Sequence, residues 1–169
     1  MKSKTFLYLF YFVILFLSSC DHGISPRLKP ERTGFSGTVI FKGAWPSDVY
    51  QTRIVGFRDT IRSSLDFTIL NIAFLSDTIP YGISLYEYES DNPKHIFKPG
   101  AGDVLRYIVV AQAIVPNPSP IREHWRVAGI YFSPIDSTKY GTVEIVKGTL
   151  VKNIDIIVDF NNPPNQPPR

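Results

Sequence analysis

Turn-forming residues interrupt the apolar stretches of this chain at intervals of roughly 8–12 residues. The 169 residues include 14 prolines and 11 glycines, and no credible long helix lies between them. Proline cannot donate to a strand ladder, and glycine weakens the interior of a strand, so this punctuation favours short strands joined by turns. The sequence therefore predicts an all-β protein, an antiparallel β-sandwich of about seven to nine strands that forms one domain over residues 34–160.

Alternation of apolar and polar residues with a period of two marks most of the expected strands. They are residues 34–42, 52–58, 67–74, 82–89, 103–115, 126–132, 142–146 and 150–160. Residues 67–74 are apolar enough for a buried strand or a short helix, and the turn residues that follow favour a strand. Residues 103–115 are the most apolar stretch and predict a central strand buried on both faces. Gly37 is expected to mark a bulge or a close approach of another backbone.

The segments on either side of this domain differ from it in composition and in their apolar pattern. Residues 21–33 contain glycine, prolines and mixed charges without an apolar period, which is typical of a flexible tether. Residues 161–169 contain four prolines and no hydrophobic residue. That composition predicts a disordered or polyproline-like tail.

The first twenty residues resemble the signal of a bacterial lipoprotein. Two lysines form a positive segment, residues 6–17 are an unbroken apolar run, and Leu17-Ser18-Ser19-Cys20 places two small residues before the only cysteine. In the bacterial lipobox the cysteine takes a diacylglyceryl group, the peptide is cut just before it, and the new amine is usually acylated, commonly with palmitate. The resemblance implies a signal peptide over residues 1–19, a lipidated Cys20 and a tether over residues 20–33.

Two other interpretations of this N-terminal stretch were weighed. A membrane-spanning helix needs roughly 20 apolar residues, and the run over residues 6–17 has twelve. A cleaved signal without lipid would leave Cys20 as a lone thiol in an exported protein. The two or three acyl chains of a lipoprotein hold firmly in a membrane, whereas a single chain binds only marginally. We therefore expect Cys20 to anchor the protein permanently.

The membrane that receives the anchor is suggested by resemblance alone. Asp21, directly after the anchor, resembles the enterobacterial signal for retention in the inner membrane. The aromatic-rich signal and the Tyr, Phe and Ile content look more like the Bacteroidetes and their relatives, whose lipoproteins often reach the outer membrane or the cell surface. We therefore expect the bacterial outer membrane, on its periplasmic or its surface face.

Charge excludes one class of partner. The chain has 18 Lys and Arg residues and 15 Asp and Glu residues. Removal of the signal would take away two lysines and leave 16 basic residues against 15 acidic ones. Nucleic-acid binding needs a basic stripe, and no block of like charge longer than two residues follows the signal. The sequence therefore predicts no nucleic-acid partner.

Three stretches resemble a known kind of envelope domain. They are residues 37–46 (GTVIFKGAWP), 105–111 (LRYIVVA) and 148–156 (GTLVKNIDI). They resemble the transthyretin-like, carboxypeptidase-regulatory-like sandwiches of Bacteroidetes envelope proteins, in which Gly-Thr-hydrophobe strands open and close the fold. The resemblance implies a transthyretin-like, or prealbumin-like, β-sandwich. Such domains are generally non-catalytic.

Catalytic and metal-binding patterns were sought among the titratable residues. No nucleophile elbow, phosphate loop, paired zinc spacing or calcium loop occurs. His124 lies beside Glu123, whose carboxylate would raise an imidazole pKa, but an exposed loop histidine explains it better. Glu87 and Glu89 would lie on one strand face roughly 6.6 Å apart, and solvated surface charges explain them as well. The sequence predicts no enzyme, no metal and no cofactor.

Exposed aromatic residues are the stronger lead to a binding site. Trp45, Trp125, Tyr86 and Tyr88 lie in expected loops or on mixed strand faces, where rings stack on sugars or anchor a protein partner. The structural alternative is that Trp45 plugs one end of the sandwich and Trp125 covers the other. We expect a non-catalytic binding or assembly role, with a glycan-binding module as the alternative and an envelope hydrolase as a more remote one.

Overall fold

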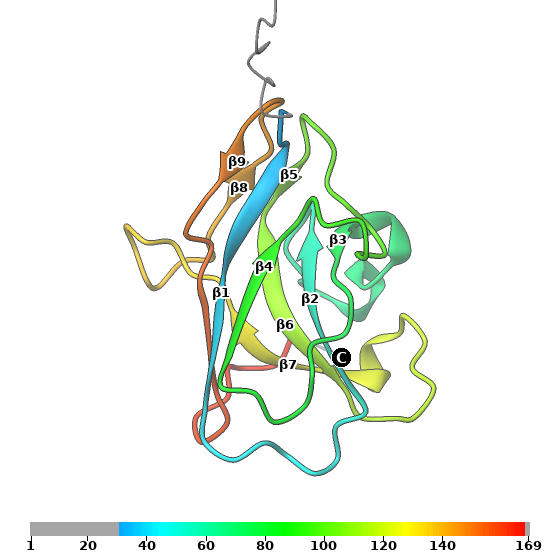
Figure 1. Ribbon diagram of the computed structural model, residues 1–169. Helices are drawn as coiled ribbons and strands as arrows, with labels where there is room; N and C mark the ends of the chain where they lie inside the picture. The colour runs from blue at the N-terminus through cyan, green and yellow to red at the C-terminus, as the bar shows by residue number, and fades with distance from the viewer. Residues whose placement is uncertain (1–30, 168–169) are drawn as a thin grey trace, which may run out of the picture. The chain divides into compact units, whose positions relative to one another are not determined.

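The computed structural model describes residues 31–167, which are folded almost entirely as β-strands and loops (Figure 1). The strands are β1 (Gly34–Lys42), β2 (Gln51–Phe57), β3 (Ile72–Leu75), β4 (Leu85–Glu89), β5 (Val104–Leu105), β6 (Tyr107–Ala113), β7 (Trp125–Ile130), β8 (Val143–Glu144), β9 (Leu150–Val151) and β10 (Ile156–Asp159). Three short 3-10 helices, η1 (Ser64–Asp66), η2 (Ile69–Asn71) and η3 (Arg122–His124), accompany them. The predicted all-β fold class is confirmed. The predicted signal peptide and Cys20 lie outside the described residues.

Eight of the strands form one curled sheet, in the order β3-β2-β6-β7-β10-β1-β4, with β9 paired to β1 beside β10. β5 and β8 form a separate two-stranded sheet. Most neighbours are antiparallel, but β1 runs parallel to both β9 and β10. A purely antiparallel sheet is therefore the wrong expectation at β1. The last strands reach β1 after a long crossover, which is the connection that parallel pairing requires.

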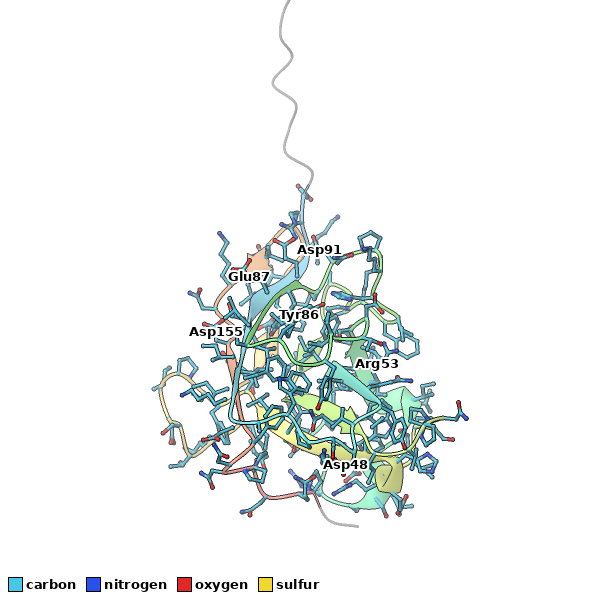
Figure 2. All side chains as sticks on the ribbon, turned by 60° about the horizontal axis from the view of Figure 1, so that its bottom comes forward. Asp48, Arg53, Tyr86, Glu87, Asp91 and Asp155 are labelled. Carbon is cyan, nitrogen blue, oxygen red and sulfur yellow. The ribbon has the colours of Figure 1, made fainter. Side chains whose placement is uncertain are left out.

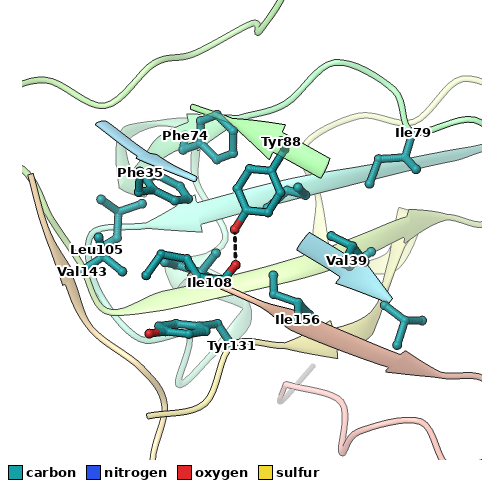
Figure 3. Packing of buried hydrophobic residues seen from close by; sticks show 14 of the residues in the cluster. Phe35, Val39, Phe74, Ile79, Tyr88, Leu105, Ile108, Tyr131, Val143 and Ile156 are labelled. Carbon is teal, nitrogen blue, oxygen red and sulfur yellow. Dashed lines mark hydrogen bonds between the residues drawn. The ribbon is translucent and has the colours of Figure 1, made fainter. Parts of the chain in front are cut away.

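The inner face of the curled sheet carries the larger core. Its members alternate along β1, β6 and β10 with residues that face outward, as a period of two requires. At its centre the Phe35 ring packs edge-to-face on Phe74 with centroids 5.0 Å apart, and on Tyr88 at 5.9 Å (Figure 3). These contacts join β1 and β4 to β3 across the interior, so the core holds the curled sheet together.

A second core lies on the outer face of β2, β6 and β7. Its buried members are Val55, Phe57, Ile61, Tyr107, Val109, Ala111, Val127 and Ile130. Every residue of β6 is buried as a result, which confirms the prediction of a strand buried on both faces. The strand is shorter than expected, because Arg106 separates β5 from β6. The segment from Ser25 onward contains both cores and their hydrogen bonds, so it has what independent folding requires.

Residues 67–74, expected to be a strand, adopt that conformation only from Ile72 onward. Before it, η1 and η2 fold over the outer core, where the Phe67 ring packs on Phe57 at 5.6 Å. Asp66 favours the turn because its Oδ2 atom accepts hydrogen bonds from the backbone N–H groups of Arg62 and Ser63, both at 2.8 Å. The Asp66 hydrogen bonds and the packing of Phe67 on the outer core therefore stabilise turns where the sequence pattern predicts a strand.

Gly37 is a point of close approach, as predicted. A Cβ atom at this position would overlap the backbone carbonyl of Ile154. The segment between β9 and β10 passes over β1 here, with Asn153 in a left-handed conformation at φ 65°. Residues 150–160 are consequently two strands instead of the single strand expected. Tyr88 lies opposite Gly37 and donates a hydrogen bond of 2.6 Å to the same Ile154 oxygen (Figure 3).

The tail contacts β7 at Gln166, where the sequence predicted a disordered or polyproline-like segment. The Gln166 side chain accepts a hydrogen bond from the Val127 N–H group and donates one to the Val127 carbonyl, both at 2.8 Å. β10 pairs with β7 at Gly129, further along the strand, so the Gln166 amide satisfies backbone groups that β10 does not reach. Arg122 Nη2 also donates to the Pro167 carbonyl at 3.2 Å.

The last residues of the predicted tether are attached to the sheet. Arg32 donates to both carboxylate oxygens of Asp91, at 2.7 and 2.6 Å, and pairs with Glu89 at 2.7 Å. Thr33 Oγ1 accepts a hydrogen bond from the Gly148 N–H group. Between residues 31 and 167, no helix is long and apolar enough to cross a membrane.

Candidate functional site

An apolar groove opens on the outer face of β2 and β6, with a volume of about 300 Å³. We call it the outer groove. Its walls include Val55, Phe57, Phe67, Ile72, Leu75 and Trp125. The loop over residues 118–120 lies on one side and residues 96–97 on another. Apolar side chains that remain open to solvent in a concave site are typical of a ligand-binding surface.

The groove forms because β6 places small residues between larger neighbours. In register across the sheet, Ala111 lies between Arg53 on β2 and Val127 on β7. The next row places Ala113 between Gln51 and Trp125. Cross-strand neighbours lie about 5 Å apart, so the side chains of the flanking strands rise on both sides of the short alanines. Ala111 is thus part of the floor of the outer groove.

Trp125, one of the four predicted aromatic candidates, lines the outer groove. It is half-buried, and its indole Nε1–H donates to the Ser119 carbonyl at 2.9 Å. Because this donor is already used, the ring offers a ligand its apolar surface and not a hydrogen bond. The short helix η3 ends immediately before Trp125.

Among residues 31–167, Arg53 is the only charged residue that lines the outer groove. Its Nε–H donates to Gln51 Oε1 at 3.2 Å, and Nη1 donates to the Ser76 carbonyl at 2.7 Å. Burial lowers the pKa of Arg53, and the charge of Asp77 opposes that shift. The guanidinium nevertheless stays protonated, because arginine does not lose its proton in proteins. One cation therefore lies at the edge of an otherwise apolar site.

The other predicted aromatic residues lie away from the outer groove. Trp45 packs on Phe41, Tyr81 and Phe160 with ring centroids 4.6, 5.1 and 5.2 Å away, and its Nε1–H donates to the Ile83 carbonyl. This placement corresponds to the alternative in which Trp45 is a structural plug.

Tyr88 does not offer a ring to solvent. It is 3% exposed, and burial raises its pKa. The interpretation of Tyr88 as a stacking residue is therefore wrong, because the ring belongs to the inner core and its hydroxyl is bonded to Ile154. Tyr86 is half-buried beside that core, and burial raises its pKa also.

A second, polar depression of about 700 Å³ lies over β1 and β4 and is lined by Tyr86, Glu87 and Glu89 among others. Figure 2 shows Glu87 on a different side of the protein from Arg53. Glu89 is paired with Arg32, whose hydrogen bond lowers the pKa of this carboxyl. Glu87 and Glu89 share a surface, and the ion pair with Arg32 places Glu89 in a different electrostatic environment from Glu87.

The remaining candidates from the sequence are not brought together with the outer groove. His124 Nδ1 accepts a hydrogen bond from the Ser119 N–H group at 2.9 Å, and Glu123 is exposed. Neither side chain lines the groove. In the part of the chain that the structure describes, no group of three or more His, Cys, Asp or Glu residues could hold a metal ion.

His95 joins the two edges of the curled sheet, a role that the sequence did not suggest. Its Nδ1 atom accepts a hydrogen bond from the Asp77 N–H group at 3.0 Å, just after β3. Nδ1 is therefore unprotonated, and Nε2 donates to the Glu89 carbonyl on β4 at 2.9 Å. β3 and β4 are the two ends of the strand order. A histidine in a loop gives no sequence pattern from which this link could be found.

We expect the protein to lose stability as the pH falls from about 7 to about 5, and expect His95 to cause part of that loss. Burial lowers the pKa of His95 from its usual 6.5, and hydrogen bonding to Glu89 only partly offsets this. The unfolded chain therefore takes up a proton in this range before the folded protein does. The neutral His95 therefore makes its full contribution to the free energy of unfolding above about pH 6.5, and this contribution decreases below that pH. Urea unfolding at both pH values measures this change.

The variant His95→Asn should show a smaller decrease between the two pH values, together with a lower stability at pH 7. His124→Gln is the matched control, because it removes an imidazole that does not link the sheet edges. If His95→Asn kept the full decrease, the imidazole link would not be its source.

Comparison of the chain with protein-family models, with curated proteins and with solved structures found no match.

Proposed function

We propose that this chain is a lipid-anchored protein of the bacterial cell envelope that binds an apolar ligand in the outer groove, without catalysing a reaction. The observation that carries the proposal is the groove itself. Apolar side chains line it, and Trp125 contributes a ring whose polar atom is already bonded within the protein. Burial of apolar surface stabilises a complex by roughly 25 cal/mol per Å², less the costs of association.

The anchor and the finer fold assignment belong to the same proposal. The resemblance of Leu17-Ser18-Ser19-Cys20 to a lipobox supports lipidation of Cys20 and attachment to the outer membrane. The three stretches quoted above support a sandwich related to transthyretin-like domains. An inner core between the sheet halves is compatible with a sandwich. A lipid-anchored domain is held at the membrane by its lipid, so its own surface is free to bind other molecules.

An apolar ligand fits the outer groove better than a glycan does. Sugars need several polar partners around a stacking ring, whereas most of the groove residues are apolar. Of the four rings that the sequence predicted for sugar stacking, Trp125 lines this groove, while Trp45, Tyr86 and Tyr88 lie elsewhere.

We expect the soluble segment from Ser25 onward to bind N-phenyl-1-naphthylamine, an uncharged apolar dye that fluoresces in dry sites. Energy transfer from tryptophan to the bound dye should fall much more in Trp125→Phe than in Trp45→Phe, because Trp125 lines the groove and Trp45 does not. Ala111→Leu should weaken dye binding about tenfold, since a larger side chain fills the groove floor. Fluorescence titration measures both effects.

Ala101→Leu is the matched control, because Ala101 is exposed in a turn. Unfolding curves recorded beside the titrations separate a blocked groove from a damaged fold. A dye that did not bind, or that bound Ala111→Leu as tightly as the unsubstituted chain, would contradict the proposal.

A further inference from the structure

Arg53 differs from Arg32, Arg58 and Arg126 in forming no ion pair among residues 31–167, although the charge of Asp77 is near enough to raise its pKa. Arg32, Arg58 and Arg126 form ion pairs with Asp91, Asp103 and Asp48 at 2.6, 3.1 and 2.7 Å. For Arg53, the hydrogen-bonding partners among residues 31–167 are an amide and a carbonyl, both uncharged. A half-buried guanidinium that makes no direct ion pair is costly, and an anion in contact with it would lower that cost.

The donors left over at this end of the groove are suited to a carboxylate. Arg53 uses Nε and Nη1 in bonds to Gln51 and Ser76, and its Nη2 group has no hydrogen-bond partner among the described residues. The Gln51 oxygen is taken by Arg53, which leaves the Gln51 Nε2 group as a donor. Gln51 and Arg53 lie two residues apart on β2 and therefore face the same side of the sheet. Two donor groups, Arg53 Nη2 and Gln51 Nε2, thus belong to side chains that are bonded to each other at this end of the groove.

The opposite side of the groove is apolar. Trp125 lies two strands away from Gln51 in the same cross-strand row, with Ala113 between them. A bound molecule that reaches from Arg53 to Trp125 therefore passes over the alanine floor of β6. A water-sized group of a ligand occupies ~30 Å³. A groove of about 300 Å³ therefore holds about ten such groups.

We propose that the outer groove binds a small anionic amphiphile, a carboxylate on an apolar body of about ten carbon atoms, with the carboxylate on Arg53 and Gln51 and the apolar body against Trp125. This inference rests on the proposed function, because it names the ligand class of the same groove. Charge complementarity selects the anion, and the apolar walls select its body. A neutral apolar molecule would leave the guanidinium unpaired, and a cationic one would be repelled by it.

The test compares decanoate with decanamide, which has the same chain length and an uncharged head. Each compound is tested as a competitor that displaces N-phenyl-1-naphthylamine from the segment that begins at Ser25. The titrations are made at pH 7.5, below the concentration at which decanoate forms micelles. We expect decanoate to bind at least about tenfold more tightly than decanamide. In Arg53→Gln this preference should fall at least about tenfold, whereas Arg53→Lys should recover part of it. Arg62→Gln removes an exposed arginine that lies outside the groove and should change nothing.

Each outcome separates the inference from the function on which it rests. If both compounds displaced the dye equally well, or if Arg53→Gln kept the preference for decanoate, the anionic ligand class would be wrong while binding in the groove would stand. If the dye bound but neither decanoate nor decanamide displaced it, the ligand class would again be wrong. If the dye itself did not bind near Trp125, the proposed function would fail, and the inference with it.

Discussion

Replacement of Phe35 by alanine is expected to lower the free energy of unfolding by about 3–5 kcal/mol. Phe35 is 0% exposed, and its ring contacts Phe74 and Tyr88 from two other strands. Its loss removes the ring contacts and leaves a cavity at the point where β1, β3 and β4 meet. Because these strands come from both ends of the sheet, the neighbouring backbone can close that cavity only in part.

Urea unfolding of the segment from Ser25 onward measures this effect. The midpoint should fall with an unchanged dependence on urea, since the surface exposed by unfolding is nearly the same. Ile135→Ala is the control, because Ile135 is 96% exposed and its change should remain within about 0.5 kcal/mol. A loss below about 1 kcal/mol for Phe35→Ala would show that the inner core does not depend on this ring.

Replacement of Cys20 by serine is expected to abolish lipid attachment and to release the protein from the membrane fraction. If Cys20 carries two or three acyl chains, each buried methylene contributes about 0.8 kcal/mol to membrane binding. A serine hydroxyl is not a substrate for thiol lipidation, so this whole contribution should vanish. The expected change is a nearly complete transfer of the protein between cell fractions.

Metabolic labelling with radioactive palmitate and fractionation of bacterial cells measure the two effects. Ser19→Ala is the matched control, because it keeps a small residue before Cys20 and should retain both the label and the membrane location. If Cys20→Ser still carried label or still sedimented with membranes, lipidation at Cys20 would be the wrong assignment. The core and the groove should be unaffected by either change, since both lie after residue 34.

Most strands could be predicted because burial on one face of a strand imposes a period of two on its residues. β1, β2 and β7 lie within a residue or two of the expected ranges, and β6, which is buried on both faces, lies inside the most apolar stretch. The rule failed at residues 67–71, where Asp66 caps a turn and Phe67 covers the outer core instead of entering the sheet. It also failed between β9 and β10, because the left-handed Asn153 interrupts a pattern that looks continuous.

The candidate site was predictable only in part. Trp125 was selected because large aromatic rings in loops are common at binding surfaces, and it does line the outer groove. Tyr88 satisfied the same criterion, yet its ring fills the inner core and its hydroxyl reaches a backbone carbonyl. Arg53 and Ala111 were not selected at all, since an arginine and an alanine in a strand pattern carry no local signal.

The sequence by itself determined the all-β class and the buried central strand, because local periodicity acts over a few residues. The need for glycine at Gly37 depends on the Ile154 carbonyl, which the fold brings to that position. Only the tertiary structure decided the parallel pairing of β1, the linking role of His95 and the outer groove. Each of these depends on residues far apart in the chain, such as Arg53, Ala111 and Trp125, which become neighbours through strand register. Register is set by the packing of whole strands against two cores, and no short stretch of sequence contains that information.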